Sequence, residues 1–99
     1  MTAKQTVLTT ITKERDIIKG YGVRRLGLFG SFARQQQKPR SDVDILVEFK
    51  QGKKTFDNFM DLKFFLEKRL HRKVDLVIKE ALKPAVKSSV THEIVYASL

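Results

Sequence analysis

The sequence predicts a mixed α/β fold (α+β mixed) in which helices alternate with strands around a small mixed sheet, in the order α-β-α-β-α-β-α. Three apolar runs, at residues 23–29, 42–49 and 73–78, have the length and β-branched content of strands. The longer segments around them repeat apolar residues every three or four positions, as amphipathic helices do. We therefore expect a sheet of three strands, or slightly more, in a single domain spanning residues 1–99.

The first half of the chain begins with an expected helix over residues 5–19. Residues 20–22 (Gly-Tyr-Gly) should end it, because glycine tolerates the left-handed backbone found just after helix ends. A short helix is expected over residues 31–37, and Pro39, which lacks a backbone N–H, indicates a turn after it. The apolar positions of the first helix are Val7, Leu8, Ile11, Ile17 and Ile18.

In the second half, a helix is expected from Thr55 to about Leu70, and its aromatic stripe is typical of core packing. The final segment, from Ala81 or Pro84 to about Tyr96, is also expected to be helical, although its hydroxyl-bearing residues weaken that pattern. The apolar stripe of the earlier helix includes Phe56, Phe59, Met60, Phe64 and Leu66.

Asp42 and Asp44 are two residues apart at the start of the second strand, so their side chains should project from one face. The helix over 55–70 is long enough to make the second and third strands parallel, which would bring Asp75 beside them. The first and second strands should then run antiparallel. Oxygen ligands gathered on one face suit Mg²⁺, and three carboxylates on adjacent strands can bind two such ions. Taken alone, Asp42 is as readily explained as a turn carboxylate and Asp44 as an edge charge, and Asp75 could be one of the charges that alternate with apolar residues on a surface strand.

Gly30 and Ser31 form a turn between the first strand and the short helix. Glycine lets the backbone approach a phosphate closely, and the serine hydroxyl and N–H groups could donate to it. Ser31 could equally be a simple helix cap. Arg34, one turn later, could reach a triphosphate, pair with an acidic side chain, or be solvated. Lys38 and Arg40 would add positive potential nearby.

The chain carries a net charge of +9, from 20 Lys and Arg against 11 Asp and Glu. This excess favours an anionic ligand without selecting one, and a basic surface with no partner remains an equal alternative. The absence of cysteine excludes disulfides and thiolate metal sites. No apolar run approaches the roughly 20 residues that span a bilayer, and no signal-peptide core is present, so we expect no membrane association and a cytoplasmic protein.

The basic run at residues 68–73 contains no interleaved aromatic residue, unlike most single-strand nucleic-acid binders. Cations are favourable at a helix C-terminus, so we interpret the run as a solvated helix end and do not expect nucleic acid as the main partner. His71 and His92 have no companions at a metal-ligand spacing and are interpreted as structural or surface residues.

The motif Gly30-Ser31, followed after ten residues by Asp42-Val43-Asp44, resembles the signature of the DNA polymerase beta-like nucleotidyltransferase superfamily. Residues 30–34 and 41–44 together are similar to the minimal nucleotidyltransferases, called the MNT family. These small proteins often act as antitoxins beside a toxin of the HEPN domain class. The resemblance covers roughly residues 23–78. Where the family usually has Gly-Glu after the arginine, this chain has three glutamines.

This resemblance implies a palm-like fold and a Mg²⁺-dependent enzyme that transfers AMP from ATP to a tyrosine hydroxyl of its HEPN toxin. Asp42 and Asp44 would each contact two Mg²⁺ ions, and Asp75 would contact the ion on the side of the attacking hydroxyl. The resemblance thus implies that these three aspartates are the catalytic residues. The implied nucleotide-binding residues are Gly30, Ser31 and Arg34. Two alternatives remain: a catalytically idle antitoxin that masks its toxin by stoichiometric binding, and a basic nucleic-acid-binding module.

Overall fold

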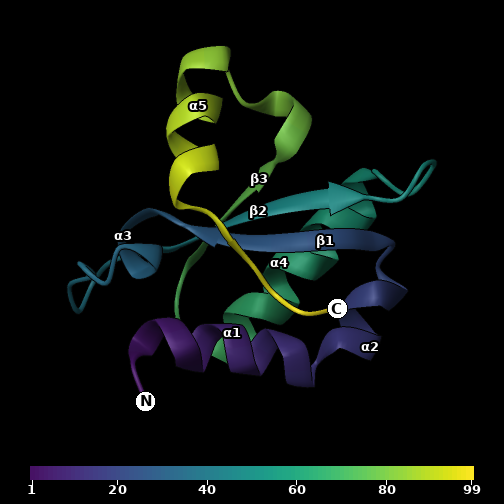
Figure 1. Ribbon diagram of the computed structural model, residues 1–99. Coiled ribbons are helices and arrows are strands. Elements are labelled where there is room, and N and C mark those ends of the chain that lie inside the picture. The colour runs from purple at the N-terminus through teal and green to yellow at the C-terminus, as the bar shows by residue number, and fades with distance from the viewer.

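The computed structural model describes residues 1–99 and contains a four-stranded sheet in the order β3-β2-β1-β4 (Figure 1). β1 pairs with β2 and with β4 in antiparallel fashion, and β2 pairs with β3 in parallel. The strand directions predicted from the sequence are therefore confirmed, and the sheet has one strand more than the three identified there. The strands are β1 (Val23–Phe29), β2 (Val43–Phe49), β3 (Val74–Ile78) and β4 (Val95–Tyr96).

Helices α1, α2 and α4 lie together on one side of the sheet, and α5 rises on the other side (Figure 1). A capping box at Thr2 fixes the start of α1, and the Thr55 hydroxyl accepts from the Asn58 N–H at 3.1 Å to cap α4. None of the helices is both long and apolar enough to span a bilayer. The helices are α1 (Ala3–Lys13), α2 (Arg15–Gly20), α3 (Gly30–Ala33), α4 (Phe56–Leu70) and α5 (Pro84–Glu93), with a short 3₁₀ turn η1 (Lys79–Ala81) before α5.

The core lies between the sheet and helices α1, α2 and α4. Alternate residues of β2 point into it, so Val43, Ile45 and Val47 are fully buried. Burying one such side chain contributes roughly 1.5–3 kcal/mol, which holds the start of β2 firmly in place. The other buried members of this core are Val7, Ile11, Ile18, Val23, Leu26, Leu28, Phe32, Ala33, Leu62, Leu66, Val74 and Leu76.

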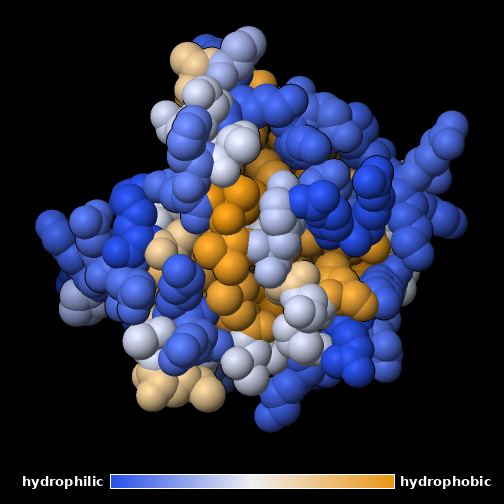
Figure 2. Space-filling view, in the orientation of Figure 1, coloured by the Kyte–Doolittle hydropathy of each residue, from blue (hydrophilic) through white to orange (hydrophobic).

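The opposite face of the sheet carries the remaining alternate residues of β2, including Leu46 and Glu48. The Glu48 side chain lies between two cations, with Arg25 Nε at 3.5 Å and Lys79 Nζ at 3.6 Å. Glu48 is 6% exposed, and the two cations offset part of the cost of burying its charge. On the face seen in Figure 2, hydrophobic side chains gather at the centre near the C-terminal segment and are ringed by hydrophilic surface.

Two sequence-based predictions about helices were wrong in their extent. The single helix expected over residues 5–19 is broken at Glu14 into α1 and α2. The hydroxyls of Thr6 and Thr10 donate to carbonyls four residues back, a type of contact that slightly destabilises helices. The short helix expected to reach residue 37 ends at Ala33, and Gln35 takes the left-handed conformation with φ 57°.

The prediction that the last helix continues to about Tyr96 was also wrong, because α5 ends at Glu93 and Val95–Tyr96 forms β4. The free edge of β1 offers unpaired backbone groups, and β4 satisfies part of them. The Ala97 N–H donates to the Leu26 carbonyl at 2.9 Å, which continues this pairing. The Arg25 guanidinium lies 3.5 Å from the centre of the Tyr96 ring, and this cation–π contact helps to hold β4 against β1.

Candidate functional site

Two carboxylates lie side by side where β2 and β3 begin. Asp44 and Asp75 are direct partners in the parallel register of these strands, whose backbones lie about 4.8 Å apart. Asp42 precedes the first residue of β2 and is exposed. The structure therefore brings Asp44 and Asp75 together at one end of the sheet, and it places Asp42 at the same end.

The electrostatics of Asp44 show that these carboxylates interact. Burial, and after it the nearby charges of Asp75 and then Asp42, together raise the pKa of Asp44 from 3.8 to about 6. The Arg34 guanidinium opposes this shift, whereas Glu93 adds to it. Negative charge is thus in excess around Asp44, a condition that a bound cation would relieve.

The donor atoms available here are carboxylate oxygens, which suit a hard cation such as Mg²⁺. No group of three His, Asp or Glu side chains converges closely enough to form a ready-made metal site. Mg²⁺ usually keeps several waters and takes only one or two carboxylates, so it needs no closed cage of side chains. The crowded charges of Asp42, Asp44 and Asp75 therefore fit Mg²⁺ in donor chemistry and in sign.

Gly30 follows directly on Phe29, the residue of β1 that is paired with Asp44. Its φ of +73° is a conformation that favours glycine, and a Cβ at this position would collide with the Asp44 carboxylate. The absence of a side chain at Gly30 therefore lets the backbone lie close to the Asp44 carboxylate. From the sequence, this close approach was expected toward a phosphate. Ser31, the next residue, is half-buried in the first turn of α3. We call Gly30 and Ser31 the elbow.

Glu93, the last residue of α5, reaches the elbow from 63 positions along the chain. The Gly30 N–H donates to Glu93 Oε1 at 2.9 Å, and Arg34 Nη1 donates to Oε2 at 2.8 Å. Burial alone would raise the pKa of Glu93, but the hydrogen bonds from Arg34 and Gly30 hold it below its usual value. Sequence reasoning missed Glu93, because nothing in its local pattern marks it.

Of the partners left open for Arg34, the structure shows an acidic side chain, that of Glu93. The Gly30 N–H has the same partner. The Ser31 N–H and hydroxyl are thus the elbow donors that remain for a phosphate.

A basic groove of about 410 Å³ lies beside Asp42, and three of the residues that line it are cationic. Arg72 helps to build it by donating to the Pro39 carbonyl at 3.0 Å, while its guanidinium lies 5.0 Å from the Phe32 ring centre. The groove is lined by Pro39, Arg40, Ser41, Asp42, Arg72 and Lys73. Its cations would attract an anionic group close to the carboxylates.

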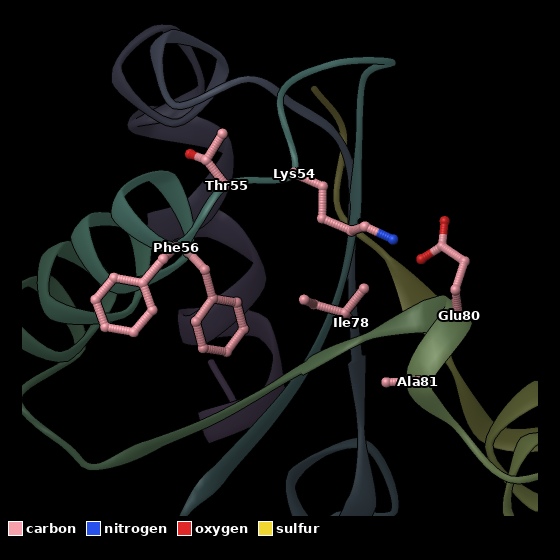
Figure 3. Close-up of a pocket in the computed structure, with 7 residues that line it drawn as sticks. Lys54, Thr55, Phe56, Ile78, Glu80 and Ala81 are labelled. Carbon is pink, nitrogen blue, oxygen red and sulfur yellow. The ribbon is translucent and has the colours of Figure 1, made fainter.

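A second cavity, of about 430 Å³, lies at the other end of β3, where that strand ends at Ile78 (Figure 3). Lys54 and Glu80 point toward one another over it, and Phe56, which is 77% exposed, lies on its α4 side. Its lining includes neither the elbow residues nor Asp42, Asp44 and Asp75. It is therefore separate from the candidate site.

Comparison with known proteins gives concordant results. The family of nucleotidyltransferase domains matches residues 10–97. The protein adenylyltransferase MntA of Thermococcus cleftensis is 40% identical over 92 residues, which cover 93% of this chain and 90% of that protein. The solved structure of a candidate minimal nucleotidyltransferase aligns with a TM-score of 0.72 and 33% identity, over 89% of this chain and 93% of that one. A toxin–antitoxin crystal structure with AMP-PNP aligns with a TM-score of 0.71 and 26% identity, over 90% of this chain and 70% of that one.

Proposed function

Because this chain belongs to the nucleotidyltransferase domain family, we propose that it is a protein adenylyltransferase that transfers AMP from ATP to a tyrosine hydroxyl of a HEPN toxin. The observation that carries the proposal is the register of Asp44 with Asp75 beside the elbow. The similarity to MntA and to a toxin–antitoxin structure with AMP-PNP supports the activity and the antitoxin role. The HEPN class and the tyrosine acceptor follow from the MNT-like motifs.

The resemblance to the MNT family assigns each carboxylate a role, and the arrangement of the strands is compatible with it. Asp42 and Asp44 would hold two Mg²⁺ ions, and Asp75, on the strand farther from the elbow, would complete the acceptor side. When bound, the ions neutralise the triphosphate and lower the pKa of the attacking hydroxyl. The acceptor oxygen bonds to the α-phosphorus, the bond to pyrophosphate breaks, and Asp75 takes the hydroxyl proton.

The elbow supplies the phosphate side of the site. The Ser31 hydroxyl and N–H donate to non-bridging oxygens of the triphosphate, and Arg34 lies beside them with its charge balanced by Glu93. In this proposal the triphosphate lies on the β1 side of Asp44 and the acceptor on the β3 side. The basic groove beside Asp42 and the net charge of +9 raise the local concentration of anions at the site. We take residues 1–99 to act as one catalytic domain in the cytoplasm.

The proposal is tested by incubating the purified protein with ATP, Mg²⁺ and the HEPN-class protein encoded beside it, and then measuring the intact mass of that protein. We expect the mass to rise by whole AMP units. A matched Asp42→Asn and Asp44→Asn double variant should bind the toxin but add nothing. A toxin that is inhibited yet unmodified, to the same degree by both forms, would contradict transfer and establish stoichiometric masking.

A further inference from the structure

We propose that Glu93 is a positioning residue that fixes the elbow of the nucleotide site by tying it to the C-terminal segment. The inference rests on the proposed function, because it assigns Glu93 a part in binding the nucleotide. It differs from the roles above in that Glu93 itself touches neither the substrate nor the metal. It acts through Gly30 and Arg34.

The backbone of Glu93 is held in place by the strand that follows it. Residues 95 and 96 pair with Leu28 and Gly27 of β1, the same strand that ends at the elbow. Ile94 packs directly over Gly27, where even a methyl group would collide with it. The backbone next to Glu93 is therefore attached to β1, the strand that leads into the elbow, and this attachment positions the Glu93 carboxylate.

Each oxygen of this carboxylate holds one donor of the elbow region. Oε1 accepts from the Gly30 N–H and Oε2 from Arg34, at the short distances typical of charge-assisted hydrogen bonds. Gly30 is buried, so its N–H would be left without an acceptor if the carboxylate were removed. The same glycine lies against the Asp44 carboxylate. Glu93 thus sets the position of the elbow relative to Asp44.

The alternative is that Glu93 occupies the place of a phosphate and leaves when a nucleotide binds. Three observations favour positioning. The charge of Glu93 is neutralised by Arg34, its backbone is tied to β1 through β4, and the Ser31 donors remain for the phosphate. The two interpretations predict opposite effects of removing the carboxylate. Positioning predicts weaker nucleotide binding, whereas a phosphate stand-in predicts tighter binding.

The test compares Glu93→Ala and Glu93→Gln with the matched control Glu80→Ala, which removes an exposed carboxylate of η1. Calorimetry with Mg²⁺ and AMP-PNP gives the dissociation constant, and toxin labelling gives KM and kcat. For Glu93→Ala we expect both the dissociation constant and the KM for ATP to rise at least about tenfold. Glu93→Gln should lose less nucleotide affinity than Glu93→Ala, because the glutamine amide oxygen can still accept from the Gly30 N–H. Glu80→Ala should match the wild type.

A double variant adds a second criterion. If Glu93 acts through Arg34, the effects of the two substitutions should not add. The double variant Arg34→Ala, Glu93→Ala should then have a dissociation constant no higher than that of the single variant that binds nucleotide less tightly. An unchanged dissociation constant in folded Glu93→Ala protein would overturn the inference in favour of a purely structural contact, and tighter binding would overturn it in favour of a phosphate stand-in. If Glu93→Ala fails to fold, Glu93→Gln decides by the same measurements. A wild type that binds no nucleotide would instead overturn the proposed function, and this inference with it.

Discussion

Replacing Asp44 with Asn is predicted to make the protein more stable at neutral pH, although Asp44 belongs to the proposed catalytic site. In the folded protein the pKa of Asp44 is raised from 3.8 to about 6. The folded state therefore binds the proton more tightly than the unfolded state, and stability falls as the pH rises from about 4 to about 6. A shift of this size corresponds to about 3 kcal/mol, which partial solvent exposure of Asp44 reduces to roughly 1–2 kcal/mol.

The uncharged amide of Asn removes this penalty, so the melting temperature should rise by several degrees at about pH 7.5 and change little at about pH 4. Thermal unfolding followed by circular dichroism at the two pH values measures the difference. Asp61→Asn, which alters an exposed carboxylate of α4, is the matched control and should leave the melting temperature nearly unchanged. A melting temperature lowered by Asp44→Asn at neutral pH, or raised equally at both pH values, would refute the electrostatic account of the site.

Three further predictions concern the site and the core. The rate of AMP transfer should fall as the pH drops through about 6, because Asp44 must be ionised to hold a cation. A higher Mg²⁺ concentration should move this fall in rate to a lower pH. Gly30→Ala should abolish AMP transfer in the labelling assay and lower thermal stability by more than about 1–2 kcal/mol, since alanine combines an unfavourable positive φ with a collision against Asp44. Leu62→Ala should cost about 2–5 kcal/mol in urea unfolding, because Leu62 is fully buried, yet the folded fraction should keep the wild-type KM for ATP.

The sequence was most informative where the signal is local. The three longer strands show apolar runs whose buried members fix their register, and the fifteen residues of α4 are enough for a parallel crossover. The pairing of Asp44 with Asp75 follows from those two features. A close approach of the backbone at Gly30 was expected toward a phosphate, and the structure shows one toward the Asp44 carboxylate, which the sequence did not predict.

The C-terminal segment could not be derived in the same way. A strand of two residues has no periodicity to detect, and β4 exists because the edge of β1 lies within reach. Glu93 reaches Gly30 only once α5 and β4 are placed by contacts distant in the sequence. Its local pattern of Thr, His and Glu predicts nothing beyond an exposed helix end.

The central claim is that the carboxylates of β2 and β3 and the elbow together hold a magnesium-bound nucleotide. Calorimetric titration of the protein with AMP-PNP, with and without Mg²⁺, tests it most directly. We predict one nucleotide bound per chain only when Mg²⁺ is present, and no binding to the Asp42→Asn and Asp44→Asn double variant. Equal binding by that variant, or binding by the wild type that does not depend on Mg²⁺, would contradict the claim.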